Sequence, residues 1–151
     1  MINIFTIIVP SYNEINLIDK FTKKLLITFY NLDIKVIFVD DGSTDGTNQW
    51  LEKNIPLRFK NKKFKVISLD KNRGKGAAIK KALNYVDGDY VGLIDSDLEY
   101  NPLDLLEMYK IICENINIDA LFGSRYIGGK IQHRKHFLND IAVRLNTFIF
   151  N

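Results

Sequence analysis

The chain has 151 residues, of which 46% are hydrophobic and 26% are charged. This length fits one domain with a buried core, and the composition excludes a disordered chain and a segment that crosses a membrane. The 21 basic and 18 acidic side chains give a net charge of +3, which is too small to indicate a nucleic-acid partner.

The cysteine content and the N-terminus bear on the cellular compartment. Cys113 is the single cysteine, which excludes an internal disulfide, and its place in an apolar helical stripe predicts a buried thiol. A free thiol fits a reducing compartment. The apolar N-terminal run lacks the basic start of a signal peptide. We therefore expect a cytoplasmic protein.

Strands and helices are predicted to alternate along the chain. The predicted strands are short apolar runs at 2–9, 36–39, 64–69, 90–94 and 120–122. The predicted helices lie at 17–29, around 50–51, at 78–83 and at 102–116, and the basic stretch 56–65 is predicted to be a solvated loop. Helix-length crossovers between buried strands indicate an α/β fold, with a mostly parallel central sheet flanked by helices on both faces.

Polar clusters follow the predicted strands. In a parallel sheet, ligands bind beyond the carboxyl ends of the strands. The clusters fall at those ends: 10–14, 40–43, 72–76, 95–99 and 123–126. Their convergence predicts one ligand site at this edge of the sheet.

Asp95 and Asp97 follow the apolar run 90–94 and are separated by Ser96. Two carboxylates at one strand end can reach one hard cation, and Mg²⁺ and Mn²⁺ prefer oxygen ligands and bridge to phosphate oxygens. Glu99, two residues further on, is a candidate third ligand. The alternative is an acidic loop that caps the next helix, but the position after a buried strand favours a metal site.

Two earlier strand ends offer groups for a nucleoside. Asp40 or Asp41 can accept hydrogen bonds from a base or from ribose hydroxyls, or can serve the turn that starts the next helix. Tyr12 could pack on a flat base and Glu14 could contact a nucleotide; a tight turn with a helix cap is the alternative there.

Two cationic positions could meet an anion. Lys75 stands among glycines at a helix start, where backbone N–H groups favour anions. This segment lacks the glycine spacing of a dinucleotide fingerprint and the ending of a P-loop. Arg125 can bind phosphate in bidentate fashion, or it can form a surface salt bridge.

Residues 130–151 form a basic segment with a broad apolar helical face. Such a helix could lie in a membrane interface against anionic lipid, or it could pack on the protein itself or on a further domain. The chain stops in the middle of this pattern, so we expect either a fragment of a longer protein or a short member of a family that usually continues.

In order along the chain, these motifs resemble those of family 2 glycosyltransferases with the GT-A fold. The resemblance is strongest to the branch of dolichol-phosphate mannose synthase and bacterial polyprenyl-phosphate sugar transferases, and it covers roughly residues 3–150. It rests on the segments 9–14, 39–47, 72–76, 95–99 and 123–126.

The resemblance implies roles for particular residues. The nucleotide-sugar-binding residues would be Pro10, Tyr12, Glu14, Asp40, Asp41, Lys75, Gly76, Asp95 and Ser96. The ligands of Mg²⁺ or Mn²⁺ would be Asp95, Asp97 and Glu99, although this branch often has Gln in place of Glu99. Asp97 and Arg125 would be catalytic, with Arg125 facing a phosphate. Residues 1–129 would form the catalytic GT-A domain and 130–151 the membrane-interfacial segment.

The implied reaction is an inverting transfer of a sugar from a GDP- or UDP-linked donor. A hydroxyl acceptor needs a general base, whereas a phosphate monoester is already anionic. After Asp119 the chain has one further carboxylate, Asp140, which favours a polyprenyl or dolichyl phosphate acceptor and a peripheral position at the cytoplasmic membrane face. Two alternative functions remain. One is transfer to a sugar hydroxyl, and the other is that of a non-catalytic nucleotide-sugar-binding subunit with a membrane-embedded partner.

Overall fold

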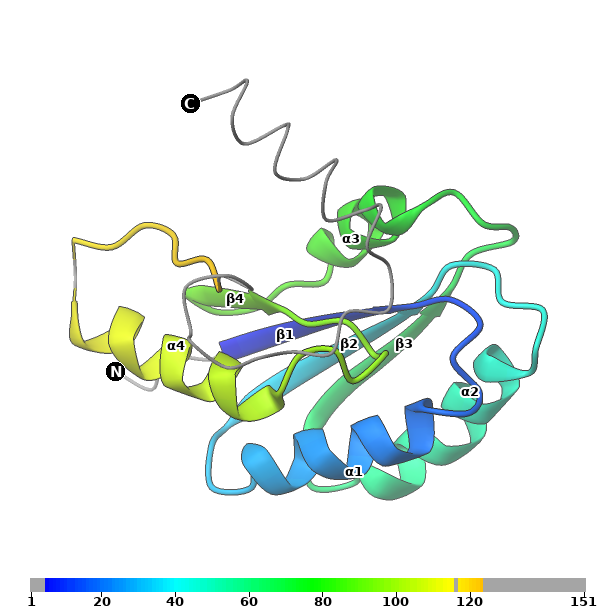
Figure 1. The fold of residues 1–151 in the computed structure, drawn as a ribbon, viewed down its shortest axis with the longest axis horizontal. Coiled ribbons are helices and arrows are strands. Elements are labelled where there is room, and N and C mark those ends of the chain that lie inside the picture. Colours follow the sequence, from blue (N-terminus) through cyan, green and yellow to red (C-terminus); the bar gives the residue numbers. More distant parts are fainter. Residues whose placement is uncertain (1–4, 116, 124–151) are drawn as a thin grey trace.

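The computed structural model describes residues 5–115 and 117–123, and within these ranges strands and helices alternate (Figure 1). The elements are β1 (Phe5–Ser11), α1 (Ile18–Thr28), β2 (Ile34–Asp40), α2 (Thr47–Arg58), β3 (Lys63–Ser68), α3 (Lys75–Leu83), β4 (Tyr90–Leu93) and α4 (Pro102–Glu114). All strand pairs described are parallel. The predicted α/β class with a parallel central sheet is confirmed.

β1 lies inside the sheet, whose strand order is β3-β2-β1-β4. Every residue of β1 is buried, because β2 and β4 pair with its two edges and helices cover both faces. Ser11 pairs with Asp40, and Asp40 pairs with Ser68, so β1, β2 and β3 end at the same level. The polar residues that follow these strands therefore meet at one edge of the sheet.

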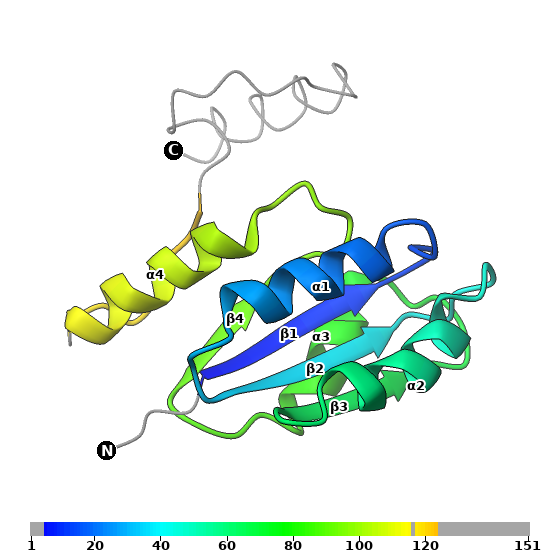
Figure 2. The same ribbon diagram turned by 90° about the horizontal axis from the view of Figure 1, so that it is seen from below.

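Alternate residues of the strands fill two cores, one on each face of the sheet. Ile7, Val9 and Phe38 belong to the core that α1, α2 and α4 cover, whereas Ile8 and Ile37 belong to a smaller core under α3. In Figure 2, α1 and α2 lie in front of the sheet and α3 lies behind it. Because both faces are covered, β1 and β2 are almost continuous apolar runs.

The predicted solvated loop over 56–65 is wrong at both ends. α2 continues through Pro56 to Arg58, and β3 begins at Lys63. A fully buried stripe holds this part of the chain to the core: Leu51, Ile55 and Phe59. Arg58 is not free in solvent, since its guanidinium stacks over Trp50 and pairs with Asp19. The charged residues of this stretch therefore suggested a loop, although they belong in part to a helix whose other face is apolar.

Two predictions near α4 are also wrong. Cys113 is exposed, because Pro102 and Leu105 are the buried residues of α4 and its last turn extends past the core. Residues 120–122 do not form a strand, since they pair with no strand of the described sheet and Phe122 is 88% exposed. A short apolar run after a helix does not by itself supply a strand neighbour.

The membrane-related predictions concern another part of the chain. Arg125 and the segment 130–151 lie outside the described residues. Within the described ranges, no helix combines the length and the apolar character that crossing a bilayer requires. The boundary at residue 129 and the interfacial role of the last segment stay predictions.

Candidate functional site

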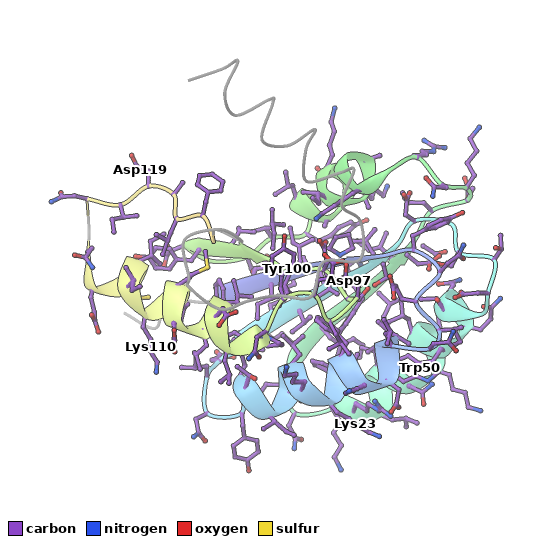
Figure 3. The ribbon with its side chains drawn as sticks, viewed as in Figure 1. Lys23, Trp50, Asp97, Tyr100, Lys110 and Asp119 are labelled. Atoms are coloured by element: carbon purple, nitrogen blue, oxygen red, sulfur yellow. The ribbon has the colours of Figure 1, made fainter. Side chains whose placement is uncertain are left out.

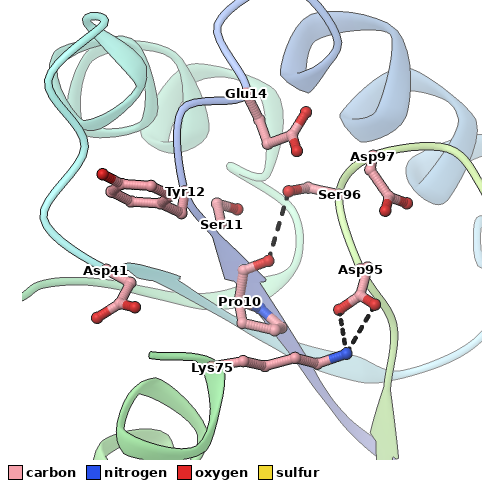
Figure 4. A pocket seen from close by; sticks show the side chains of 9 residues that line it. All are labelled: Pro10, Ser11, Tyr12, Glu14, Asp41, Lys75, Asp95, Ser96 and Asp97. Atoms are coloured by element: carbon pink, nitrogen blue, oxygen red, sulfur yellow. Dashed lines mark hydrogen bonds and ion pairs between the residues drawn. The ribbon is translucent and has the colours of Figure 1, made fainter. Parts of the chain in front are cut away.

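A pocket opens at the carboxyl edge of the sheet, where the polar clusters converge (Figure 4). Its lining comes from four separate stretches of the chain: Pro10, Ser11, Tyr12, Glu14, Asp41, Lys75, Asp95, Ser96 and Asp97. In Figure 3, Asp97 lies over the middle of the fold, whereas Lys23 on α1 and Lys110 on α4 lie on its outside. The predicted convergence of strand ends is therefore present in the structure.

The segment after β1 is held by side chains that follow β2. The N–H groups of Asn13 and Glu14 donate hydrogen bonds to Ser43 Oγ at 2.9 Å and to Thr47 Oγ1 at 2.8 Å. The N–H of Ile15 donates to Asp45 Oδ2 at 3.0 Å. These bonds fix the backbone that carries Tyr12 and Glu14 into the pocket, and the left-handed φ of 56° at Asn13 belongs to this tight turn.

Sequence reasoning missed this clamp of Ser43, Asp45 and Thr47. The three side chains reach residues about 30 positions away in the sequence, so no local pattern reveals their partners. The available signal was the density of hydroxyl and carboxylate groups in 43–47. These residues support the pocket without lining it.

The adjacent carboxylates Asp40 and Asp41 have different surroundings. Asp41 lines the pocket, and its Oδ1 accepts a hydrogen bond from the N–H of Arg73 at 2.9 Å. Asp40 is 1% exposed and does not line the pocket; its Oδ2 accepts from the N–H of Ser43 at 2.9 Å. The structure thus gives Asp40 the turn-forming contact and places Asp41 in the lining of the pocket.

Asp95, Ser96 and Asp97 form the opposite wall. Ser96 is buried, and its hydroxyl donates to the carbonyl oxygen of Pro10 at 3.4 Å, which joins this wall to β1. Asp97 Oδ1 accepts from the N–H of Glu99 at 2.9 Å, which closes a turn around Leu98, whose φ is 64°. This turn fixes the direction of the Asp97 side chain.

Negative charge accumulates on one side of the pocket. Burial raises the pKa of Glu14, and the neighbouring carboxylates of Asp97, Asp45, Asp95 and Glu99 raise it further. A carboxyl group with a raised pKa reports an environment in which negative charge is costly. The same environment favours a bound cation.

Ser11 also lines the pocket, and sequence reasoning did not single it out. The residue is 3% exposed, and within the described part of the chain its Oγ has no hydrogen-bond partner. Buried hydroxyl groups are normally paired, so an unpaired one beside a pocket is a candidate for a ligand contact. Of the other predicted site residues, Gly76 follows Lys75 in α3 and Glu99 is exposed after β4, and neither lines the pocket.

The donor chemistry of the pocket fits a hard divalent cation. Among the described residues, no group of three or more His, Cys, Asp and Glu side chains has the arrangement of a complete metal site. Asp95 and Asp97 both line the pocket, however. Mg²⁺ is commonly held by one or two protein carboxylates, with phosphate oxygens and water as its other ligands. Two carboxylates therefore suffice where a phosphate-containing ligand is bound.

Comparison with known proteins agrees with the fold and with the motifs. The family model described as Glycosyl transferase family 2 matches residues 6–150. The chain therefore belongs to glycosyltransferase family 2.

Individual relatives support the same class. The chain is 34% identical over 151 residues to dolichyl-phosphate beta-glucosyltransferase of Saccharomyces cerevisiae, covering 97% of this chain and 45% of that protein. Its structure is similar to mannosyltransferase PcManGT from Pyrobaculum calidifontis in complex with GDP-Man and Mn²⁺, with a TM-score of 0.53 and 32% identity over 62% of this chain and 27% of that one. S. aureus TarS 1–349 in complex with UDP gives a TM-score of 0.54 and 32% identity over 73% of this chain and 32% of that one.

These similarities confirm the predicted GT-A fold. The chain spans 37 to 62% of the length of three curated relatives, so the similarity concerns one part of each of those proteins.

Proposed function

We propose that this chain carries the donor site of an inverting glycosyltransferase, which moves a sugar from a GDP- or UDP-linked donor to a polyprenyl phosphate. The observation that carries the proposal is the pocket itself. Asp41, Lys75 and the Asp95–Asp97 segment come from three separate strand ends and line one cavity. Family membership and the nucleotide complexes of two similar structures support a nucleotide-sugar ligand.

In this proposal the nucleoside lies between the ends of β1 and β2. Tyr12 is 42% exposed and offers a ring face to the base. Asp41 is held by the N–H of Arg73, and an ionised carboxylate can accept further hydrogen bonds from the base or the ribose. The unpaired Ser11 hydroxyl supplies another polar contact.

The diphosphate lies toward the acidic wall and Lys75. A divalent cation held by Asp95 and Asp97 would neutralise the charge that develops on the departing nucleoside diphosphate. Lys75 adds a positive charge on the α3 side of the pocket. The exposed Glu99 is proposed as a further ligand, and its backbone contact with Asp97 keeps it beside this wall.

The proposed acceptor is a lipid phosphate. A relative covered by 97% of this chain is named a dolichyl-phosphate beta-glucosyltransferase. A phosphate monoester is anionic near neutral pH, so its attack on the anomeric carbon needs no general base. Arg125, which follows the described residues, is proposed to position that phosphate, and 130–151 to bring the chain to the membrane surface.

Calorimetric binding of UDP, GDP, CDP and ADP, each with and without Mn²⁺, tests the donor site. Tight binding of UDP or GDP that depends on Mn²⁺ is expected. The matching nucleotide sugars are then incubated with a polyprenyl phosphate in detergent and, in a parallel assay, with sugar acceptors that present hydroxyl groups. Product on the hydroxyl acceptors alone would contradict the lipid-phosphate acceptor. Donor binding without any turnover would instead support the non-catalytic subunit.

Asp97→Asn is the sharpest variant for this test, because it removes a charge while keeping the side-chain shape. We expect the Mn²⁺-dependent part of nucleotide binding to fall at least about tenfold. Glu107→Gln, on the exposed side of α4, is the control for the same chemical change away from the pocket. Equal Mn²⁺ dependence in the two variants would remove Asp97 from the metal site.

A further inference from the structure

The pocket contains an ion pair between two residues. The proposed function assigns a different ligand to each of them. Lys75 Nζ lies 2.7 Å from Asp95 Oδ1 and 2.7 Å from Asp95 Oδ2 (Figure 4). One ammonium group therefore contacts both oxygens of the carboxylate. In the proposed function the same carboxylate holds the divalent cation, and Lys75 meets the diphosphate.

The ammonium and a divalent cation compete for Asp95. Both are positive, and like charges repel strongly at contact distance in a partly desolvated pocket. The Asp95 side chain is 21% exposed, whereas that of Lys75 is 57% exposed. Lysine also carries its charge on a flexible four-carbon stem. Lys75 is therefore the partner that can leave, while Asp95 is held in the pocket wall.

We propose that Lys75 is a placeholder for the divalent cation. Before ligands enter, its ammonium neutralises Asp95; when metal and nucleotide bind, it moves to the diphosphate oxygens. The inference rests on the proposed function and adds a coupling between the two ligands. Metal alone must displace Lys75 without giving it a new partner, so it binds weakly. A nucleoside diphosphate provides that partner, so each ligand strengthens binding of the other by the same factor.

Mn²⁺ binding to the 151-residue chain tests this coupling without an activity assay. Electron paramagnetic resonance of free Mn²⁺ gives the metal affinity in the presence and absence of UDP or GDP. The proteins compared are the wild type, Lys75→Gln and Lys80→Gln. Lys80 is exposed on the same helix and does not line the pocket, so Lys80→Gln controls for the loss of one positive charge.

Lys75→Gln should bind Mn²⁺ alone about threefold more tightly than the wild type, the scale of one partly exposed ion pair. The enhancement of Mn²⁺ binding by the nucleotide should fall about fivefold in the same variant. Lys80→Gln should behave as the wild type. Unchanged or weaker binding of Mn²⁺ alone to Lys75→Gln would overturn the inference, as would absence of Mn²⁺ binding to all three proteins.

Two controls test whether a changed fold or the new side chain itself, rather than the loss of the ammonium group, causes the result. Circular dichroism and urea unfolding verify the fold of Lys75→Gln, and Lys75→Met repeats the test with an apolar stem in place of the lysine. If no nucleotide binds the wild type, the proposed function fails. The comparison of Mn²⁺ alone still decides whether Lys75 competes for Asp95.

Discussion

A Cβ atom at Gly42 would lie 2.4 Å from the carbonyl carbon of Lys71. The loop after β2 therefore packs against the loop before α3 with no room for a side chain. Beside this contact, Asp41 Oδ1 accepts a hydrogen bond from the N–H of Arg73. The loop after β2 and the first residue of α3 supply Asp41 and Lys75 to one pocket, so this close approach positions the groups that we propose for the base and for the diphosphate.

Gly42→Ala should lower the free energy of unfolding by about 2 kcal/mol or more, because the alanine would meet the Lys71 backbone and a strained φ. The φ of Gly42 is +72°, a conformation that favours glycine. Nucleotide affinity should fall with stability, since the Asp41 loop must shift. Urea unfolding and calorimetry measure the two effects.

Gly76→Ala is the matched control for this change. Gly76 lies inside α3, and a Cβ there would have no atom within 4 Å. Alanine is favoured over glycine in a helix, so a gain of up to about 0.5–1 kcal/mol is expected at this first-turn position. Equal destabilisation by the two substitutions would show that backbone contact at Gly42 is not the cause.

Ser11→Ala should weaken nucleotide binding without lowering the free energy of unfolding. The Ser11 hydroxyl is buried and unpaired within the described part of the chain, so its removal leaves no partner behind. The free energy of unfolding should stay the same or rise by up to about 1 kcal/mol. Donor-nucleotide affinity should fall about five- to tenfold, the worth of one lost hydrogen bond.

The control for Ser11→Ala is Ser68→Ala, because Ser68 ends β3 on the far side of β2, is exposed and does not line the pocket. Calorimetry and urea unfolding are applied to both. A Ser11→Ala variant that binds nucleotide as the wild type does would exclude the hydroxyl from the site. A large loss of stability would show that it has a structural partner.

The centre of the sheet could be predicted because β1 and β2 are buried on both faces. Val9 belongs to one core and Ile8 to the other, so both positions must be apolar and the run is easy to recognise. α2 was harder to predict, because the charge of Arg58 suggested a solvated loop. In the structure its guanidinium packs over the Trp50 ring. Charge in a sequence does not tell whether the stem of a side chain packs on an aromatic ring.

The candidate site was predictable to the extent that strand topology determines it. Once the sheet is parallel, Asp41 and Asp95 must lie at the same edge. The clamp on Asn13 and the contact between Lys75 and Asp95 were not predictable, because they join residues far apart in sequence through side-chain geometry. The sequence pattern therefore predicted most residues that line the pocket, but not Ser11 and not which of the lining residues contact one another.

The ionisation of Glu14 should make stability depend on pH in the absence of metal and nucleotide. Burial, followed by the neighbouring Asp97, raises its pKa above the ordinary value of 4.5. Between 4.5 and the raised value, the folded protein binds this proton more firmly than the unfolded chain does. The contribution of Glu14 to stability is therefore most favourable below this window and falls as the pH rises through it.

Glu14→Gln cannot ionise, so its stability relative to the wild type should increase as the pH is raised from about 4 to about 7. Urea unfolding in the presence of a chelator measures this difference. Glu107→Gln on the exposed side of α4 controls for the removal of one negative charge. A difference between Glu14→Gln and the wild type that stays constant with pH would contradict the raised pKa. Addition of Mn²⁺ with nucleotide should reduce the pH-dependent difference, because a cation in the pocket stabilises the ionised form of Glu14.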